Sequence, residues 1–126
     1  MSLKDWLTKN LYVTTPNDPD PFFRPRKYAN TKEEVTRAVL ETIGGLKRWK
    51  ILEHRENQGR VRASVAAKLL PFADDVDIYV VQGLDGTTKL EVLSRAQGGK
   101  GDFGRNKRNL KEFLSALDAV LPPSAS

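Results

Sequence analysis

The order of apolar and polar positions divides most of the chain into two helical stretches with extended stretches between them. In residues 31–44, apolar side chains recur every three or four positions, which is typical of an amphipathic helix. Thr31 and Glu34 have capping-box spacing at its start, and Gly44-Gly45 favours its end. The second helical stripe consists of Leu110, Phe113, Leu114, Leu117 and Leu121. We therefore expect two helices, each with one apolar face to bury.

Between the two helices, alternation of apolar and polar residues predicts strands. The four expected strands are Trp49–His54, Val61–Leu69, Val76–Val80 and Leu90–Ser94. Short loops, among them the Asp85-Gly86 turn, make consecutive strands antiparallel neighbours. We predict an α+β fold, a two-layer sandwich in which a four-stranded antiparallel meander carries two helices on one face. The order along the chain is helix, strands, helix.

The first 30 residues follow other patterns. Leu3, Trp6, Leu7 and Leu11 have the spacing of a short amphipathic helix over residues 3–12, which would dock on its own domain or on a partner. Four of the seven prolines lie in residues 14–30, which predicts an extended arm. We expect an amphipathic segment and arm over residues 1–30, a single domain over 31–121 and a tail over 122–126.

Size and composition narrow the class of protein. A chain of 126 residues is long enough to bury a core without disulfides or metals. The chain has no cysteine, which excludes disulfides, thiolate catalysis and thiolate metal sites. The sequence shows neither a secretory signal pattern nor a window with the roughly 18 apolar residues of a membrane span. We expect a cytoplasmic protein, at most bound to a membrane surface.

The net charge of +5 is concentrated in one segment. Residues 95–111 hold six basic side chains and one acidic side chain, and they include a loop with Gly98, Gly99, Gly101 and Gly104. Amides that precede a helix can hold an anion, although the glycine spacing is not that of a phosphate or dinucleotide loop. There are two alternatives to an anion site: the basic residues form a solvated helix face, and the glycines allow a tight connection from strand to helix.

A polar network is expected near this loop. Asp75 and Arg95 could pair across neighbouring strands, while Asp102 and Asn106 could fix the loop to the last helix or cap it. Removing one partner of such a set costs more than the pair contributes. The spacing leaves open whether the network is a scaffold, a ligand site or both. The candidate binding residues are Asp75, Ser94, Arg95, Lys100, Asp102, Gly104, Arg105, Asn106, Lys107 and Arg108.

Catalytic and metal chemistry have weaker signals. His54 is the single histidine, and no serine or metal partner is placed beside it by the sequence. Asp74, Asp75 and Asp77 form the one acidic cluster, and an Asp-Asp pair before a strand is more typical of a turn than of a metal site. We predict no metal and no cofactor, and we assign no catalytic residue.

Several segments together resemble a known family. Leu70-Pro71-Phe72 is followed by Asp74-Asp75-Val76, and Pro16-Asn17 and residues 25–28 match the N-terminal region. The tail carries Ser94-Arg95, Gly99, Asp102-Phe103-Gly104, Asn106, Leu110 and Phe113. Over residues 16–121 the chain resembles the bacterial and plastid family called domain of unknown function 1499. Departures are Leu93, Ala96, Gln97 and Asn109, where the family tends to carry Arg, Ser, Arg and Arg. The resemblance implies no established activity, and the occurrence of the family in cyanobacteria and plastids suggests a photosynthetic setting.

These observations favour a small non-catalytic binding or accessory module that acts through residues 97–108 on a protein partner or an acidic group. A first alternative is binding of nucleic acid or of an anionic membrane surface through the basic face. A second alternative is a small-ligand-binding domain or an enzyme that uses Asp75 or His54. The sequence leaves the identity of the partner and the oligomeric state open.

Overall fold

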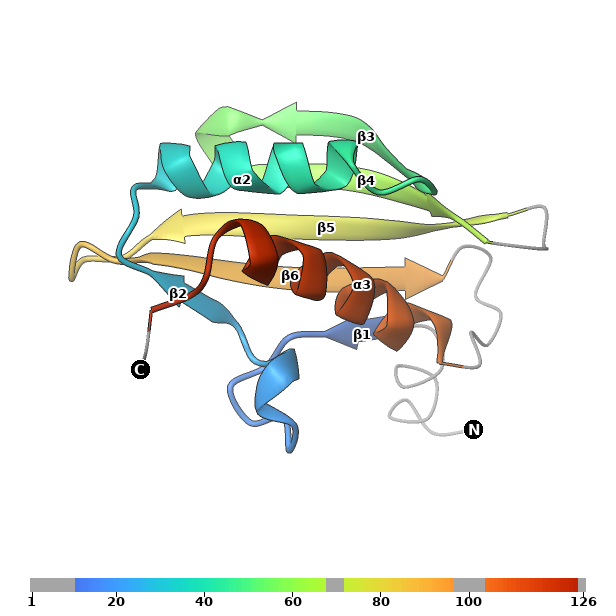
Figure 1. Ribbon diagram of the computed structural model, residues 1–126, viewed down its shortest axis with the longest axis horizontal. Coiled ribbons are helices and arrows are strands. Elements are labelled where there is room, and N and C mark those ends of the chain that lie inside the picture. The colour runs from blue at the N-terminus through green and yellow to red at the C-terminus, as the bar shows by residue number, and fades with distance from the viewer. Residues whose placement is uncertain (1–10, 68–71, 97–103, 125–126) are drawn as a thin grey trace.

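The computed structural model describes residues 11–67, 72–96 and 104–124, and it places a layer of two helices against one antiparallel sheet (Figure 1). The strands are β1 (Leu11–Val13), β2 (Arg26–Tyr28), β3 (Trp49–Arg55), β4 (Arg60–Ala66), β5 (Ala73–Gln82) and β6 (Thr88–Ala96). The helices are α2 (Lys32–Gly44) and α3 (Arg105–Val120). Two short 3₁₀ turns, η1 (Pro21–Phe23) and η2 (Glu56–Gln58), complete the described elements.

The strands follow the order β1-β6-β5-β4-β3, and β2 also pairs with β6. The consecutive strands β3 to β6 form the expected meander, but the described sheet has six strands, so the prediction of four is wrong. The two additional strands lie within the first 30 residues, and both precede α2 in the chain. They cover an edge of β6 whose amide and carbonyl groups would otherwise lack partners.

The predicted helix over residues 3–12 is wrong where it can be checked. Leu11 and Tyr12 lie in β1, opposite Arg95 and Ser94 of β6. A helix of ten residues is marginal on its own, and pairing with a free sheet edge supplies main-chain hydrogen bonds along the extended chain. Residues 1–10 lie outside the described part of the structure.

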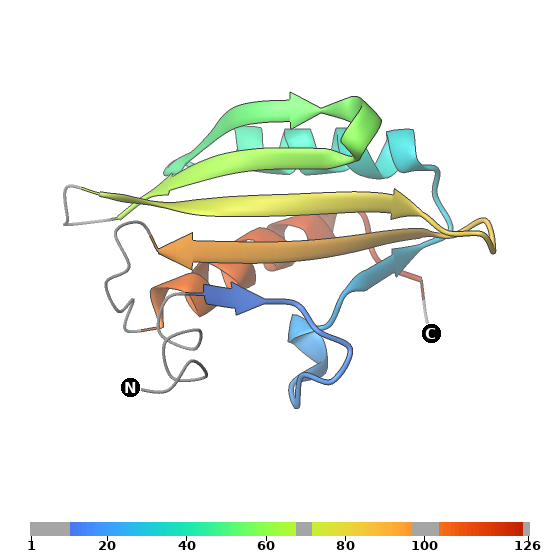
Figure 2. The same cartoon turned by 180° about the vertical axis from the view of Figure 1, so that it is seen from behind.

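Both helices cover the same face of the sheet, as predicted (Figures 1 and 2). Helix α2 packs on β3 and β5, and α3 packs on β6 and β1. The buried core lies between the two layers and includes Val39, Ile43, Ile78, Leu90, Phe113 and Leu117. In the view from behind, no described helix covers the other face of the sheet (Figure 2).

Helix α2 forms for the reason that its sequence indicates. The Thr31 side chain accepts a hydrogen bond from the Glu34 amide, and the Glu34 carboxylate accepts one from the Thr31 amide. These hydrogen bonds satisfy two of the amide groups that a helix start leaves unpaired, and they lower the pKa of Glu34. The predicted helix over residues 31–44 is therefore confirmed.

One local prediction in the sheet is wrong. Asp74 and Asp75 do not form a turn, because β5 already begins at Ala73 and both lie in the strand. The regular alternation expected for residues 49–54 is interrupted by a bulge between Ile51 and Glu53 of β3.

Candidate functional site

Helix α3 begins beside the end of the sheet where β5 starts and β6 stops. Its N-cap is Gly104, with a φ of 83°, a left-handed conformation that glycine adopts at little cost. Among the described residues no side chain caps this helix, so the prediction of Asn106 as the cap is wrong. Asn106 lies within the first turn and is buried instead. Asp102, the other candidate cap, and Lys100 lie outside the described residues.

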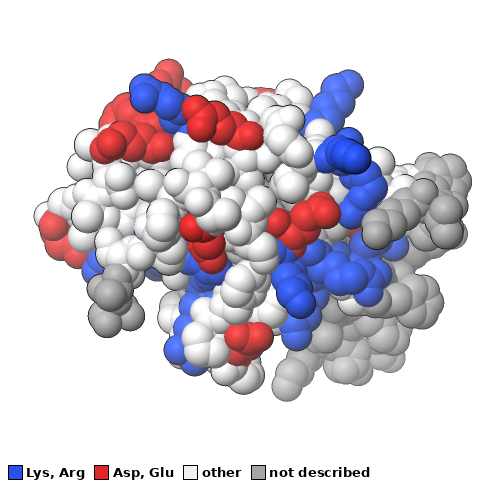
Figure 3. All heavy atoms as spheres, viewed as in Figure 1, with Lys and Arg blue, Asp and Glu red and all other residues white. Residues whose placement is uncertain are grey.

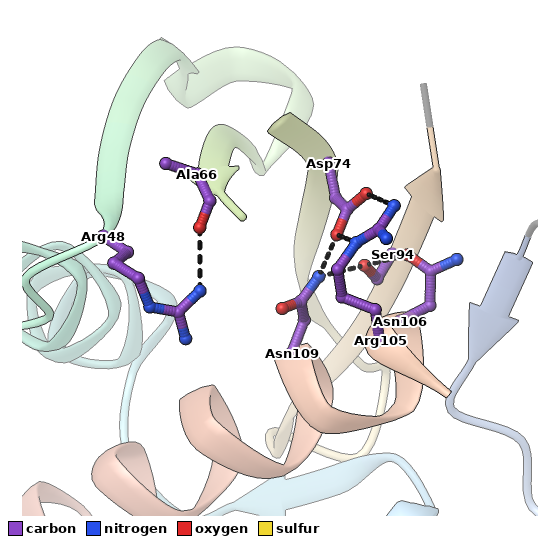
Figure 4. A network of polar contacts seen from close by, with 7 residues as sticks. All are labelled: Arg48, Ala66, Asp74, Ser94, Arg105, Asn106 and Asn109. Atoms are coloured by element: carbon purple, nitrogen blue, oxygen red, sulfur yellow. Dashed lines mark hydrogen bonds and ion pairs between the residues drawn. The ribbon is translucent and has the colours of Figure 1, made fainter. Parts of the chain in front are cut away.

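A buried polar cluster joins the start of α3 to β5 (Figure 4). The Arg105 guanidinium donates to Asp74 through Nε at 2.7 Å and Nη2 at 2.8 Å. Asn109, one turn further along the helix, donates to the same carboxylate at 2.9 Å. The Asp74 side chain is 1% exposed, so its charge is neutralised almost entirely by protein groups.

Strand β6 contributes the second half of the cluster. The Ser94 hydroxyl donates to the side-chain Oδ1 of Asn106 at 2.7 Å and accepts from the side-chain Nδ2 of Asn109 at 3.2 Å. Ser94, Asn106 and Asn109 are all buried. Figure 4 shows these side chains pointing toward one another from α3, β5 and β6. The cluster therefore fixes the start of α3 on the sheet.

The sequence interpretation missed two members of this cluster. In the sequence, Asp74 stands out only as part of an acidic cluster, and Asn109 only as a departure from the family pattern. The signal for Asp74 was its position two residues before Val76 on the same face of β5. Asn109 follows Arg105 by four positions, so both reach the same carboxylate.

The predicted pair of Asp75 and Arg95 lies elsewhere. The two residues face each other in the β5–β6 register, as expected for a cross-strand pair. Successive side chains on a strand point to opposite faces, so this pair lies on the side of the sheet away from α3, whereas Asp74 and Ser94 lie under it. The sheet thus separates the candidate residues into two groups, and a single site that includes both groups is excluded.

A basic hollow lies on the outer side of α3. Its volume is about 450 Å³, and Lys107, Arg108 and Lys111 line it. Asp20, Phe22, Phe23 and Gly104 form the rest of its lining. Figure 3 shows basic side chains gathered at the lower right, near the N-terminal half of α3, while acidic side chains gather at the upper left.

The arm shapes one wall of the basic hollow. The Lys107 ammonium lies 5.0 Å from the ring centroid of Phe23 and 5.7 Å from that of Tyr12, which are cation–π distances. The Tyr12 hydroxyl donates to Asp18 at 2.8 Å. Burial and this hydrogen bond raise the pKa of Tyr12 to about 12. The ring therefore stays neutral and fixed beneath the lysine at physiological pH.

A partly buried ion pair holds the arm against the other end of α3. Arg26 donates to the Asp118 carboxylate through Nε at 3.1 Å and Nη2 at 3.0 Å. Its Nη1 also donates to the carbonyl of Phe22 at 2.6 Å, next to the hollow. These contacts hold the arm against α3, so the hollow between them is already formed without a ligand.

Comparison with known proteins identifies the family. A family model described as a protein of unknown function, DUF1499, matches residues 3–117. The chain belongs to this family. The resemblance carried by the Asp74-Asp75-Val76 and Asp102-Phe103-Gly104 segments is thereby confirmed. None of the curated proteins matches the chain.

A solved structure has a similar fold. It is the X-ray crystal structure of protein CV1439 from Chromobacterium violaceum, with a TM-score of 0.51 and 17% sequence identity. The match covers 91% of this DUF1499 chain and 99% of the other chain. At this level of identity, the likeness shows a shared fold and nothing about function.

Metal chemistry has little support in the described part of this DUF1499 protein. No group of three or more histidine, aspartate or glutamate side chains there could hold a metal ion. The three acidic residues of β5 do not converge, since Asp74 binds Arg105 under the helix and Asp77 pairs with Arg60 on the other face. His54 is exposed and lines a different hollow of about 330 Å³ with Lys32 and Arg37. None of the described helices is long and apolar enough to cross a bilayer.

Proposed function

We propose that this DUF1499 protein is a non-catalytic binding module, and that the basic hollow holds a compact acidic group of a partner protein. One observation carries the proposal: Lys107, Arg108 and Lys111 line a single recess, in which Asp20 is the one acidic residue among the described lining. Clustered positive charge in a recess attracts anions more strongly than the same charges on a convex surface.

The construction of the recess supports binding of a small group. The rings of Phe23 and Tyr12 restrain the Lys107 ammonium. A side chain that is already restrained loses less conformational entropy when it binds, so more of the interaction energy appears as affinity. Phe22 and Phe23 add an apolar lower wall, which suits an acidic group next to a hydrophobic side chain.

The same contacts make nucleic acid a weaker candidate. Single-stranded nucleic acid binds by stacking its bases on aromatic faces. Here Lys107 lies over the Phe23 ring, and the Arg26 guanidinium lies 5.0 Å from the Phe22 ring centroid. A protein cation therefore already covers one face of each ring. Three cations would also release few counterions, so duplex binding through this hollow would be weak at physiological salt.

A titration with tetraglutamate peptide, followed by amide chemical shifts in NMR, tests the proposal. We expect shifts concentrated at residues 107–111, with binding that weakens as salt rises. Changing Lys107→Gln together with Lys111→Gln should lower the affinity roughly tenfold, because two charge-assisted contacts are lost. The matched control, Lys47→Gln with Lys50→Gln, removes the same charge from exposed positions outside the hollow and should change the affinity by less than about twofold.

Two results would contradict the proposal. Equal weakening in both double variants would show that only net charge matters. Absence of tetraglutamate binding, together with Lys107-dependent binding of a DNA duplex or of phosphatidylserine vesicles, would instead support one of the two polyanion alternatives.

A further inference from the structure

A second hollow lies between the N-terminal arm and the β5–β6 hairpin, and its volume is about 690 Å³. Pro16, Arg24 and Pro25 form the arm side, and Gly83, Leu84 and Thr87 lie on the hairpin side. None of the three cations of the basic hollow lines it. This hairpin groove is therefore a separate feature whose volume lies within the range of small-molecule sites, roughly 300–1,000 Å³.

The hairpin side of the groove is rigid. The Asp85 carboxylate accepts hydrogen bonds from the Thr87 amide at 3.0 Å and the Thr87 hydroxyl at 2.6 Å. The Gly83 amide donates to the Thr87 carbonyl at 2.7 Å, and Gly86 takes a φ of 84° that the tight turn requires. The hydrogen bonds from Thr87, assisted by Lys27, hold the pKa of Asp85 well below its usual range, so the carboxylate keeps these contacts at neutral pH.

The two sides are also held in place relative to each other. Strand β2 of the arm pairs with β6 of the hairpin, with Lys27 opposite Lys89 in the register. Lys27 also forms an exposed ion pair with Asp85 at the hairpin, with 3.2 Å between Nζ and Oδ2. On the arm side, Pro16 and Pro25 restrict the backbone, because their rings fix φ. A preformed groove needs little reorganisation on binding, which favours affinity for even a small ligand.

The lining combines an apolar surface with four basic side chains, which are Arg24, Arg26, Lys27 and Lys89. Leu84 is wholly exposed at the hairpin, the most exposed large apolar side chain in the described residues. The Arg24 Nε donates to the Asp18 carbonyl at 2.9 Å, which fixes the guanidinium on the arm. Its two Nη groups make no hydrogen bond among the residues that the structure describes. A fixed guanidinium with both Nη groups available is suited to bidentate binding of a carboxylate.

We propose that the hairpin groove binds an amphipathic carboxylate, a linear aliphatic chain with one terminal carboxyl group. The carboxylate lies on Arg24, and the chain lies along Pro16, Pro25 and Leu84. Of the other lining cations, Arg26 is paired with Asp118, Lys27 with Asp85, and Lys89 with Glu91 at 3.0 Å. Arg24 is therefore the cation that selects the charged end. This inference is independent of the proposed function, because the two hollows share no lining residue.

The test compares sodium decanoate, below its micelle concentration, with the neutral decanol, using amide and arginine Nε chemical shifts of the full chain. We expect saturable shifts at Gly83, Leu84 and Thr87 and at the Arg24 Nε, with decanoate binding roughly tenfold more tightly than decanol. This comparison needs no substitution, so it does not depend on the folding of a variant.

Variants then assign the two ends of the ligand. Arg24→Gln should reduce decanoate affinity to that of decanol, whereas Arg37→Gln, a change of the same type on α2, should leave it unchanged. Leu84→Asn should weaken both ligands roughly tenfold, because apolar burial is lost. Leu52→Asn, a matched change at an exposed leucine on β3, should have no effect.

The proposal is overturned by equal affinity for decanoate and decanol, or by shifts that avoid the hairpin. It is also overturned if each variant behaves like its control. The tetraglutamate test probes Lys107 and Lys111 at the basic hollow, which do not line the hairpin groove. Absence of decanoate binding would therefore contradict this inference and leave the proposed function untouched.

Discussion

Helix α3 carries two groups of polar side chains in opposite environments. Arg105 and Asn109 point inward, where they bind Asp74 in a buried cluster. Lys107 and Lys111 line a recess on the outer side of the same helix. The sequence segment 95–111 presents all of these as one basic stretch, yet the fold uses Arg105 for its own assembly. A count of charges therefore overestimates the charge that a partner can reach.

The two groups contribute differently to stability because one is buried and the other is exposed to solvent. A buried carboxylate without its partner cannot recover its hydration, so a broken pair is costly. Exposed cations keep their hydration, and each contributes little to stability. The inner cluster should therefore determine the stability of the protein, and the outer group should determine what it binds. The following predictions examine this division, from the largest effect to the smallest.

Asp74→Ala should lower the free energy of unfolding by about 3 kcal/mol, because it leaves the largely buried Arg105 charge without its carboxylate. Urea unfolding measures the change. The double variant Asp74→Ala with Arg105→Met should recover a substantial part of the loss, since the buried charge is then removed as well. A loss below about 1 kcal/mol in the single variant would contradict a stabilising role for the cluster.

Two buried hydroxyls should respond differently to removal. Ser94→Ala should cost about 1–2 kcal/mol, because Asn106 and Asn109 both lose a partner. Tyr28→Phe should be neutral or stabilising, since the Tyr28 hydroxyl has no hydrogen-bond partner among the described residues. Burial, joined by the Asp118 carboxylate, raises the pKa of Tyr28, so its proton remains in place at neutral pH. Thermal unfolding of both variants checks the contrast, and a larger loss in Tyr28→Phe would contradict it.

The smallest effect is expected at the outer recess. Asp20→Asn removes the acidic lining residue and should raise the affinity for tetraglutamate about twofold to threefold, in line with the modest strength of exposed charge interactions. Isothermal titration calorimetry in 50 mM and 200 mM salt measures the gain, which should shrink at the higher salt. A decrease in affinity would show that Asp20 contacts the ligand directly or positions the arm.

Much of the fold was predictable from local patterns. The capping box at Thr31, the apolar stripe of α3 and the order of the four central strands follow from side-chain periodicity, and periodicity depends only on neighbours in the chain. The two N-terminal strands were harder to predict, because Leu11–Val13 and Arg26–Tyr28 become strands only by pairing with the edge of β6. A three-residue strand carries no period that a sequence can display.

The candidate site shows the same limit. Six of the ten predicted binding residues lie at the start of α3 or within the buried cluster and the basic hollow; these are Ser94, Gly104, Arg105, Asn106, Lys107 and Arg108. Asp75 and Arg95 lie beyond the sheet, and Lys100 and Asp102 lie outside the described residues. Composition shows that residues 95–111 are rich in basic side chains, but it does not say which of these side chains are buried.

The sequence by itself determined where α2, α3 and the four central strands form, because the spacing of apolar residues and the caps act over a few positions. Only the tertiary structure decided that Asp74, Ser94, Arg105 and Asn109 meet, since these residues approach one another from separate elements. The physical reason is the desolvation of charge: an aspartate buried under α3 requires a fixed cation, and the arrangement of sheet and helix selects Arg105 from the basic side chains in that segment.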